Sequence, residues 1–123
     1  MMRKVAMLLG GAMLAGLAGP ALAADCARPP APAKIDGATA TMEQLQAGKA
    51  EVTAFMGASD TYQSCLIDDL EAQRKAAKAE KKKLDPAVAK ATDAKVSENQ
   101  ADKERVGADF NGAVKAYKAA HPS

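Results

Sequence analysis

The sequence predicts an all-α protein, an antiparallel, coiled-coil-like hairpin of two helices preceded by an extended proline-rich N-terminal arm that a disulfide ties to it. Only 3% of the residues are aromatic and Trp is absent, which disfavours a sandwich or barrel of β-strands. Two long stretches carry apolar residues at helical spacing, and the helix-start signal Asp85-Pro86 separates them. The 123 residues are enough for one small domain.

Residues 1–23 have the three parts of an export signal. Two basic residues open the chain, an uncharged run of Ala, Leu, Met and Gly follows, and Ala21-Leu22-Ala23 forms a small-residue cleavage site. We expect cleavage after Ala23 and an exported protein, periplasmic or secreted. A retained membrane anchor is the weaker alternative because the apolar run is shorter than the roughly 20 residues of a spanning helix. A lipid on Cys26 is disfavoured because Asp25 precedes it.

The charges of the remaining chain are segregated. Loss of residues 1–23 leaves 15 basic residues against 15 acidic ones. Residues 24–71 carry a net charge of −5, residues 72–83 carry +5, and residues 84–123 sum to zero. Such a dipole differs from the broad basic surface of a nucleic-acid-binding protein, so no nucleic-acid partner is expected.

Residues 24–40 contain three prolines and little apolar content, which predicts the extended arm. The helical domain follows over residues 41–123. Thr41 and Gln44 have the spacing of a capping box and predict a first helix over about residues 42–83. Its apolar stripe keeps its phase through Gly57-Ala58-Ser59-Asp60, so we expect one continuous helix, with a break at these residues as the alternative.

Asp85 is an expected N-cap and Pro86 suits the first helical position, which predicts a second helix over about residues 86–120. A connection of one or two residues makes long helices antiparallel neighbours, and a turn at 84–85 gives facing residues whose numbers sum to about 169. The expected neighbours are Val52 and Tyr117, Ser59 and Phe110, Tyr62 and Val106, and Leu70 and Asn99.

Cys26 in the arm and Cys65 in the first helix predict one disulfide in an exported chain. An arm extended at about 3.1 Å per residue is long enough to fold back along the helix and reach Cys65. A redox pair is the weaker interpretation because the spacing is not C-x-x-C.

Three stretches of the sequence are similar to known proteins: residues 36–41, residues 62–66 and residues 99–111. Together they resemble a group of small exported α-helical proteins of Gram-negative bacteria. The resemblance covers most of the chain after residue 23. It implies export and helical structure, and it carries no known activity.

No catalytic, cofactor-binding or metal site is predicted. His121 is the single histidine and lies beside a chain end that we expect to fray, and no metalloprotease, P-loop or serine-hydrolase motif occurs in the sequence. Asp68, Asp69 and Glu71 are interpreted as a solvated face, because Ca²⁺ requires six to eight converging oxygens. Asn99 lies on the apolar stripe of the second helix. We interpret it as a residue that fixes the register, with hydrogen bonding to a ligand as the alternative.

Two classes of function remain, neither of them enzymatic. In the first, an exported hairpin presents a helical surface to an unknown protein partner or to a second copy, using a strip that includes Met42, Met56 and Ile67. In the alternative, a cell-envelope module makes peripheral contact with anionic membrane or lipopolysaccharide through its basic hairpin tip. The tip could also serve only as a solubilising face. The basic residues of the tip are Arg74, Lys75, Lys78, Lys81, Lys82 and Lys83.

Overall fold

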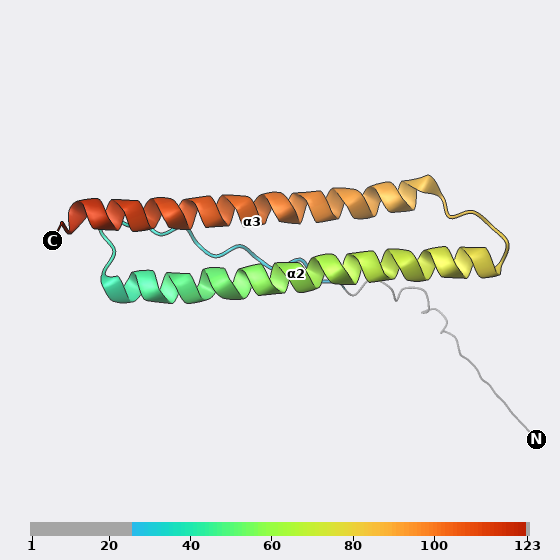
Figure 1. Cartoon of the computed structure of the whole chain (residues 1–123), viewed down its shortest axis with the longest axis horizontal. Coiled ribbons are helices and arrows are strands. Elements are labelled where there is room, and N and C mark those ends of the chain that lie inside the picture. Colours follow the sequence, from blue (N-terminus) through green and yellow to red (C-terminus); the bar gives the residue numbers. More distant parts are fainter. Residues whose placement is uncertain (1–25, 123) are drawn as a thin grey trace, which may run out of the picture.

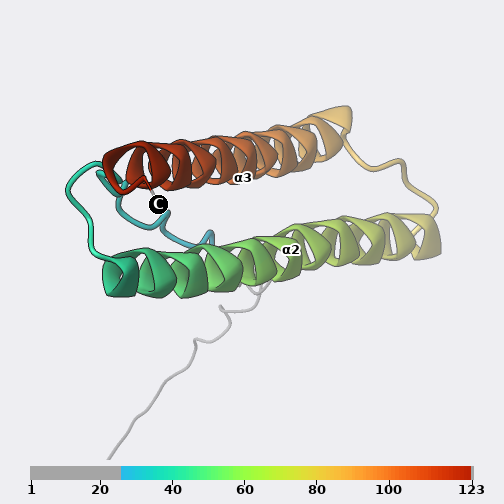
Figure 2. The ribbon, with the colours of Figure 1, turned by 60° about the vertical axis from the view of Figure 1, so that its left-hand side comes forward.

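The computed structural model describes residues 26–122, which form two long helices side by side (Figures 1 and 2). Helix α2 spans Met42–Ala79 and helix α3 spans Pro86–Ala120, and the two run antiparallel. The expected all-α hairpin is therefore confirmed. The expected export signal, residues 1–23, lies outside the described residues.

Helix α2 begins at the predicted capping box. The backbone N–H of Gln44 donates to the Thr41 hydroxyl over 3.0 Å, and the Gln44 side chain accepts from the Thr41 N–H over 2.8 Å. The helix is continuous through residues 57–60, so the alternative of a break there is wrong. Ser59 is buried at the centre of the hairpin, where a larger side chain would hold the two helices apart.

Helix α2 ends at Ala79, four residues before the expected end near residue 83. Lys81 has a φ of 59°, its N–H donates to the Lys78 carbonyl over 2.9 Å, and the Lys82 N–H donates to the Ala77 carbonyl over 2.8 Å. These two bonds form a Schellman motif, which satisfies carbonyls that the end of a helix leaves free. The helix-forming residues up to residue 83 predicted a longer helix. The expected end is wrong because the Schellman motif stops α2 at Ala79.

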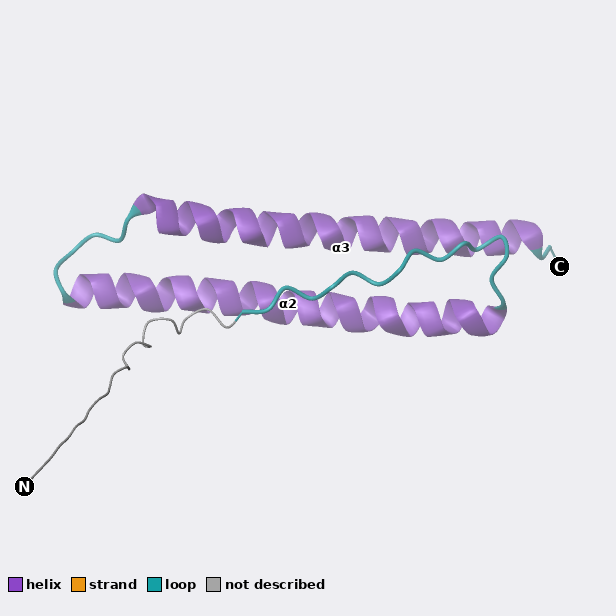
Figure 3. Cartoon of the chain, turned by 180° about the vertical axis from the view of Figure 1, so that it is seen from behind, coloured by secondary structure: helices purple, strands orange, loops and turns teal. Residues whose placement is uncertain are grey.

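Helix α3 begins and ends where it was predicted. The Asp85 side chain accepts from the Ala87 N–H over 2.9 Å, and Pro86 occupies the first helical position. Residues 80–85 connect the two helices as an open loop rather than as a turn of one or two residues (Figure 3). Among the described residues, neither helix contains a stretch apolar and uncharged enough, over sufficient length, to cross a membrane.

The predicted register of the two helices is wrong. Ser59 lies against Asn99, with a hydrogen bond of 3.2 Å, whereas the sequence placed Phe110 there and Leu70 against Asn99. Tyr117 packs at the cluster of Leu45 and Ala113 rather than near Val52. The expected register assumed a turn of one or two residues, whereas the longer connection over residues 80–85 does not fix the register in that way. A buried amide facing Leu70 would lack a partner, whereas Ser59 supplies one.

Phe110 does meet a small residue, but the residue is Gly48. A Cβ on Gly48 would lie 3.5 Å from Phe110 and would overlap the side chain of Ile35. Ile35 therefore fills the space that the glycine leaves, beside the core cluster of Ala40, Leu45 and Ala113.

Residues 26–41 form no helix or strand and run along the groove between the two helices (Figure 3). We name residues 26–40 the N-terminal segment. Gly37 passes so close to Ala113 that a Cβ there would overlap the Ala113 carbonyl. Lys34 forms an ion pair of 3.9 Å with Asp109 of α3. One side of the hairpin is thus covered by the chain itself.

Replacement of Lys81 by Gly should raise the free energy of unfolding by about 1 kcal/mol, because the left-handed conformation costs an L-residue with a Cβ about that much. Urea unfolding followed by circular dichroism measures it. Lys83→Gly is the matched control, since Lys83 has no positive φ and its replacement should bring no gain. Equal losses of stability in both variants would contradict the left-handed turn at Lys81.

Candidate functional site

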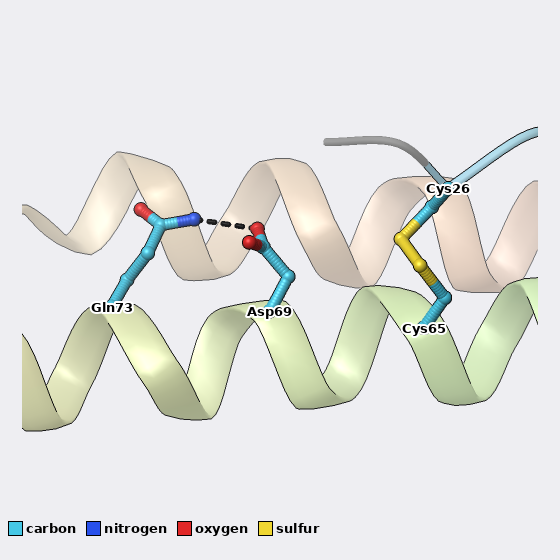
Figure 4. The surroundings of a disulfide bond; sticks show 4 residues. All are labelled: Cys26, Cys65, Asp69 and Gln73. Atoms are coloured by element: carbon cyan, nitrogen blue, oxygen red, sulfur yellow. Dashed lines mark hydrogen bonds between the residues drawn. A yellow bond between two sulfur atoms is a disulfide. The ribbon is translucent and has the colours of Figure 1, made fainter. Parts of the chain in front are cut away.

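The predicted disulfide between Cys26 and Cys65 is confirmed (Figure 4). Its two Cα atoms lie 5.6 Å apart, and it joins the start of the N-terminal segment to the middle of α2. A bridge that closes a loop of about 40 residues stabilises a fold by roughly 4 kcal/mol in the chain-entropy model. In a hairpin with few large apolar residues, this bridge is a principal source of stability.

A group of charged residues holds the N-terminal segment to α3 next to the disulfide. The Arg28 guanidinium donates to the Asp102 carboxylate over 2.7 and 3.1 Å and lies 3.4 Å from Glu98. Arg105 donates to the other oxygen of Asp102 over 3.2 Å. The hydrogen bond from Arg28 is the main reason that the pKa of Asp102 lies below its usual value. Sequence analysis missed this group because Arg28 and Asp102 are 74 positions apart and only the register shows that they meet.

The middle of the hairpin contains a buried polar network. Ser59 and Asn99 are both 0% exposed. The Asn99 amide donates to the Ser59 hydroxyl over 3.2 Å, and its oxygen accepts from the Gln63 amide over 2.9 Å. Both ends of the Asn99 side chain are therefore used within the fold, as a register-fixing role requires.

The six basic residues of the tip are all exposed at one end of the hairpin, around the end of α2 and the loop that follows. Lys82 lies 3.5 Å from Glu80, and among the described residues it is the one member of this group with an ion pair. The Schellman turn places Lys81, Lys82 and Lys83 outside the helix. Their charges are thus in water and accessible to a large anionic surface.

Within residues 26–122, no part of the chain covers the side of the hairpin opposite the N-terminal segment. On α3, the segment contacts Asp102, Asp109 and Ala113, and at 3.6 residues per turn Val96 and Gly107 point to the other side. We name this side the uncovered face. It consists of Met56, Asp60, Gln63 and Ile67 of α2 and Val96, Gln100, Lys103 and Gly107 of α3.

Cross-helix pairs order this face. Lys103 donates to Asp60, Gln63 donates to Gln100 over 3.3 Å, and a Cβ on Gly107 would lie 3.7 Å from Met56. Of the three residues of the expected apolar strip, Ile67 is 46% exposed and Met42, closer to the start of α2, is 50% exposed, whereas Met56 is half-buried. The pairing that orders the face depends on the register and was not predicted.

Within residues 26–122, no three His, Cys, Asp or Glu side chains lie together as a metal site would need. Asp69 accepts a hydrogen bond of 2.7 Å from Gln73, while its neighbours Asp68 and Glu71 are exposed. The His121 ring stacks on Tyr117 with 4.1 Å between the ring centroids. His121 also closes the end of α3 through its backbone N–H.

Comparison of the chain with models of protein families, with curated proteins and with solved structures found no match in any of the three. A proposal about function must therefore be based on the surfaces described above.

Asn99→Ala should lower the free energy of unfolding by roughly 1–3 kcal/mol, because it leaves the buried Ser59 hydroxyl without its partner. A double-mutant cycle with Ser59→Ala should give a coupling energy of about 1 kcal/mol, measured by urea unfolding. Asn111→Ala is the control: Asn111 is exposed on the same helix, so its change should stay within about 0.5 kcal/mol. Additive effects of the first two substitutions would show that the buried pair does not couple the helices.

Proposed function

We propose that this protein is an exported, periplasmic, non-enzymatic hairpin that binds a second copy of itself through the uncovered face. The observation that carries the proposal is the asymmetry of the hairpin. The N-terminal segment covers one side, whereas the other side exposes Ile67 beside an ordered set of cross-helix pairs. The disulfide supports export, because such bonds persist in oxidising compartments.

The spacing of the uncovered face suits packing against helices. Met56, Asp60, Gln63 and Ile67 follow one another at intervals of four, three and four residues, which keeps side chains on one seam of a helix. The same intervals separate the face residues of α3, which are Val96, Gln100, Lys103 and Gly107. Two hairpins that pack by these seams form a four-helix bundle.

The order of side chains along the seam makes the face complementary to itself. A two-fold axis in the face, perpendicular to the helices and midway between Asp60 and Gln63, places Met56 of one copy against Ile67 of the second. Polar residues then meet polar residues at the centre, and apolar residues meet on either side. This antiparallel arrangement also keeps the two basic tips, each carrying +5 over residues 72–83, at opposite ends.

Ile67→Glu should weaken self-association at least tenfold, because each dimer would bury two added carboxylates in an apolar contact. Sedimentation over a range of concentrations measures the mass, and circular dichroism checks the fold. Thr61→Glu is the matched control, since Thr61 is exposed on the side of α2 that faces away from α3. A wild-type chain that stays monomeric at about 1 mM, where association is weaker than about −4 kcal/mol, would overturn the proposal.

A second candidate function is supported by the exposed basic tip. Six basic side chains gather at one end of an elongated molecule, with Glu80 the carboxylate closest to them in sequence. Near an anionic lipid surface, each basic residue contributes about 1 kcal/mol to attraction. The tip has only alanines between its charges on α2, so contact would be peripheral and without insertion of the helix.

Lys78, Lys81, Lys82 and Lys83 replaced together by Gln should abolish binding to vesicles that contain phosphatidylglycerol, since four charges are removed while helix-forming side chains remain. Co-sedimentation with vesicles measures binding. Wild-type binding should fall with added salt, because the Debye length shortens from about 10 Å at 0.1 M to about 3 Å at 1 M.

The matched control for the tip removes four charges from the other end of the hairpin. Its substitutions are Lys34→Gln, Lys49→Gln, Lys115→Gln and Lys118→Gln. Equal losses in the two quadruple variants would mean that net charge matters and not the tip. Absence of wild-type binding at low salt would leave the tip as a solubilising face and exclude this second candidate.

A further inference from the structure

Burial along the first part of the N-terminal segment repeats every three residues. Ile35 packs at Gly48, which is 17 positions back along α2 from Cys65, a distance of about 26 Å at about 1.5 Å per helical residue. The nine residues from Cys26 to Ile35 thus advance close to 3 Å each, as in a polyproline II helix, which has three residues per turn. One edge of this helix faces the hairpin and the rest of it is exposed. The half-buried residues of that edge are Cys26, Pro29, Pro32 and Ile35.

Residues 26–34, which we name the strap, have few polar contacts apart from the disulfide. Among the described residues, no backbone hydrogen bond outside the helices involves the strap, as a polyproline II helix allows. Arg28 and Lys34 form its ion pairs with acidic residues of α3, and both basic side chains are exposed. Exposed ion pairs contribute little to stability. The bridge at Cys26 is therefore the main attachment of the strap.

Residues 35–40 are held without help from the disulfide. Ile35 fills the space beside Gly48, and the backbone of Gly37 lies directly against α3. Ala40 is 4% exposed, and its N–H donates to the Asp36 carbonyl over 3.0 Å. The two parts of the N-terminal segment therefore differ in what holds them, with the boundary between Lys34 and Ile35.

The strap covers apolar side chains of both helices. Pro32 of the strap lines one space together with Val52 of α2 and with Val106 and Phe110 of α3. Val106 is 5% exposed with the strap in place. Cys26 and Cys65 are only half-buried, so a small dithiol can approach the bridge that holds this cover.

We propose that the strap is a redox-controlled cover: when a dithiol reduces the Cys26–Cys65 bridge, residues 26–34 leave the groove, while residues 35–40 and the two helices stay in place. A thiolate of the dithiol attacks one sulfur of the bridge, and its second thiol then displaces the protein sulfur from the mixed disulfide. The dithiol becomes a disulfide, and Cys26 and Cys65 take up its two electrons and two protons as thiols. The bridge is the substrate of a reductant here and not a redox catalyst, so it needs no C-x-x-C spacing.

Opening of the strap is a local event, because the contacts that hold the helices together lie elsewhere. The Asn99 network and the cluster at Leu45 and Ala113 involve no residue of the strap. Release exposes Val52, Val106 and Phe110 to water as an apolar groove. The uncovered face lies on the opposite side of the hairpin, so the cover acts independently of the proposed self-association.

The test compares the exported chain, with its disulfide formed, before and after addition of dithiothreitol. NMR relaxation should give backbone order parameters near 0.85 for Ala31 and Ala33 with the bridge closed, and below about 0.6 after reduction. Gly37 and Thr39 should keep the rigid value in both states. Fluorescence of the dye ANS should rise as the groove opens, while the helical circular dichroism is unchanged. A double variant, Cys26→Ser with Cys65→Ser, should show the open state without reductant.

Two substitutions in the reduced chain locate the boundary of the strap. Ile35→Ala should extend the mobile part to Gly37 and Thr39, because it removes the side chain that fills the space at Gly48. Pro30→Ala is the matched control, since Pro30 is exposed and its replacement should leave the boundary unchanged.

Three results would overturn the proposal. The strap could stay rigid after reduction, whether or not 1 M salt then loosens it, and the ion pairs or the prolines would be its attachment. Mobility could reach Thr39 in the reduced wild-type chain, which would remove the boundary at Ile35. The helical signal could be lost on reduction, and the bridge would then hold the whole fold rather than the strap. Sedimentation of the oxidised chain tests self-association separately.

Discussion

The Cys26–Cys65 disulfide fixes one end of the N-terminal segment to the middle of α2, and the segment then crosses the groove between the helices as far as Ala40. Two helices alone bury one stripe each and leave a gap beside Gly48, where Ile35 packs. The core at the base of the hairpin therefore contains side chains from three parts of the chain. The disulfide lowers the conformational entropy of the unfolded chain. The N-terminal segment therefore loses less entropy when it is ordered along the groove.

Local signals in the sequence were sufficient for the elements of this fold. The capping box at Thr41 and the helix start at Asp85 each depend on hydrogen bonds within a few residues, so these two helix starts did not depend on the rest of the chain. The end of α2 was missed because Lys81 has a left-handed backbone without the glycine that marks such a turn. Nothing in its side chain signals the conformation.

The register could not be predicted by matching apolar stripes alone. Phe110 lies against the small residue Gly48. The sequence offered Ser59 as an equally small partner for Phe110, and the apolar pattern does not distinguish between the two. The contact that distinguishes the registers is polar and lies at the centre of the hairpin, where Asn99 and Ser59 are buried together. Burial of an amide is costly unless it has hydrogen-bond partners, so the buried pair is compatible with one register of the two helices. Apolar contacts are less selective, because apolar side chains can pack in several registers.

This register also decides what the uncovered face contains. In the register expected from a tight turn, Asp60 would lie near Asp109 and Ile67 near Asp102, so like charges would meet across the helices and an apolar side chain would face a carboxylate. In the observed register Asp60 pairs with Lys103, and Asp102 is left free to hold Arg28 of the N-terminal segment. One buried hydrogen bond thus sets the ion pairs on both sides of the hairpin. The covered side gains its tie to α3, and the uncovered side gains the order on which the proposed recognition of a second copy depends.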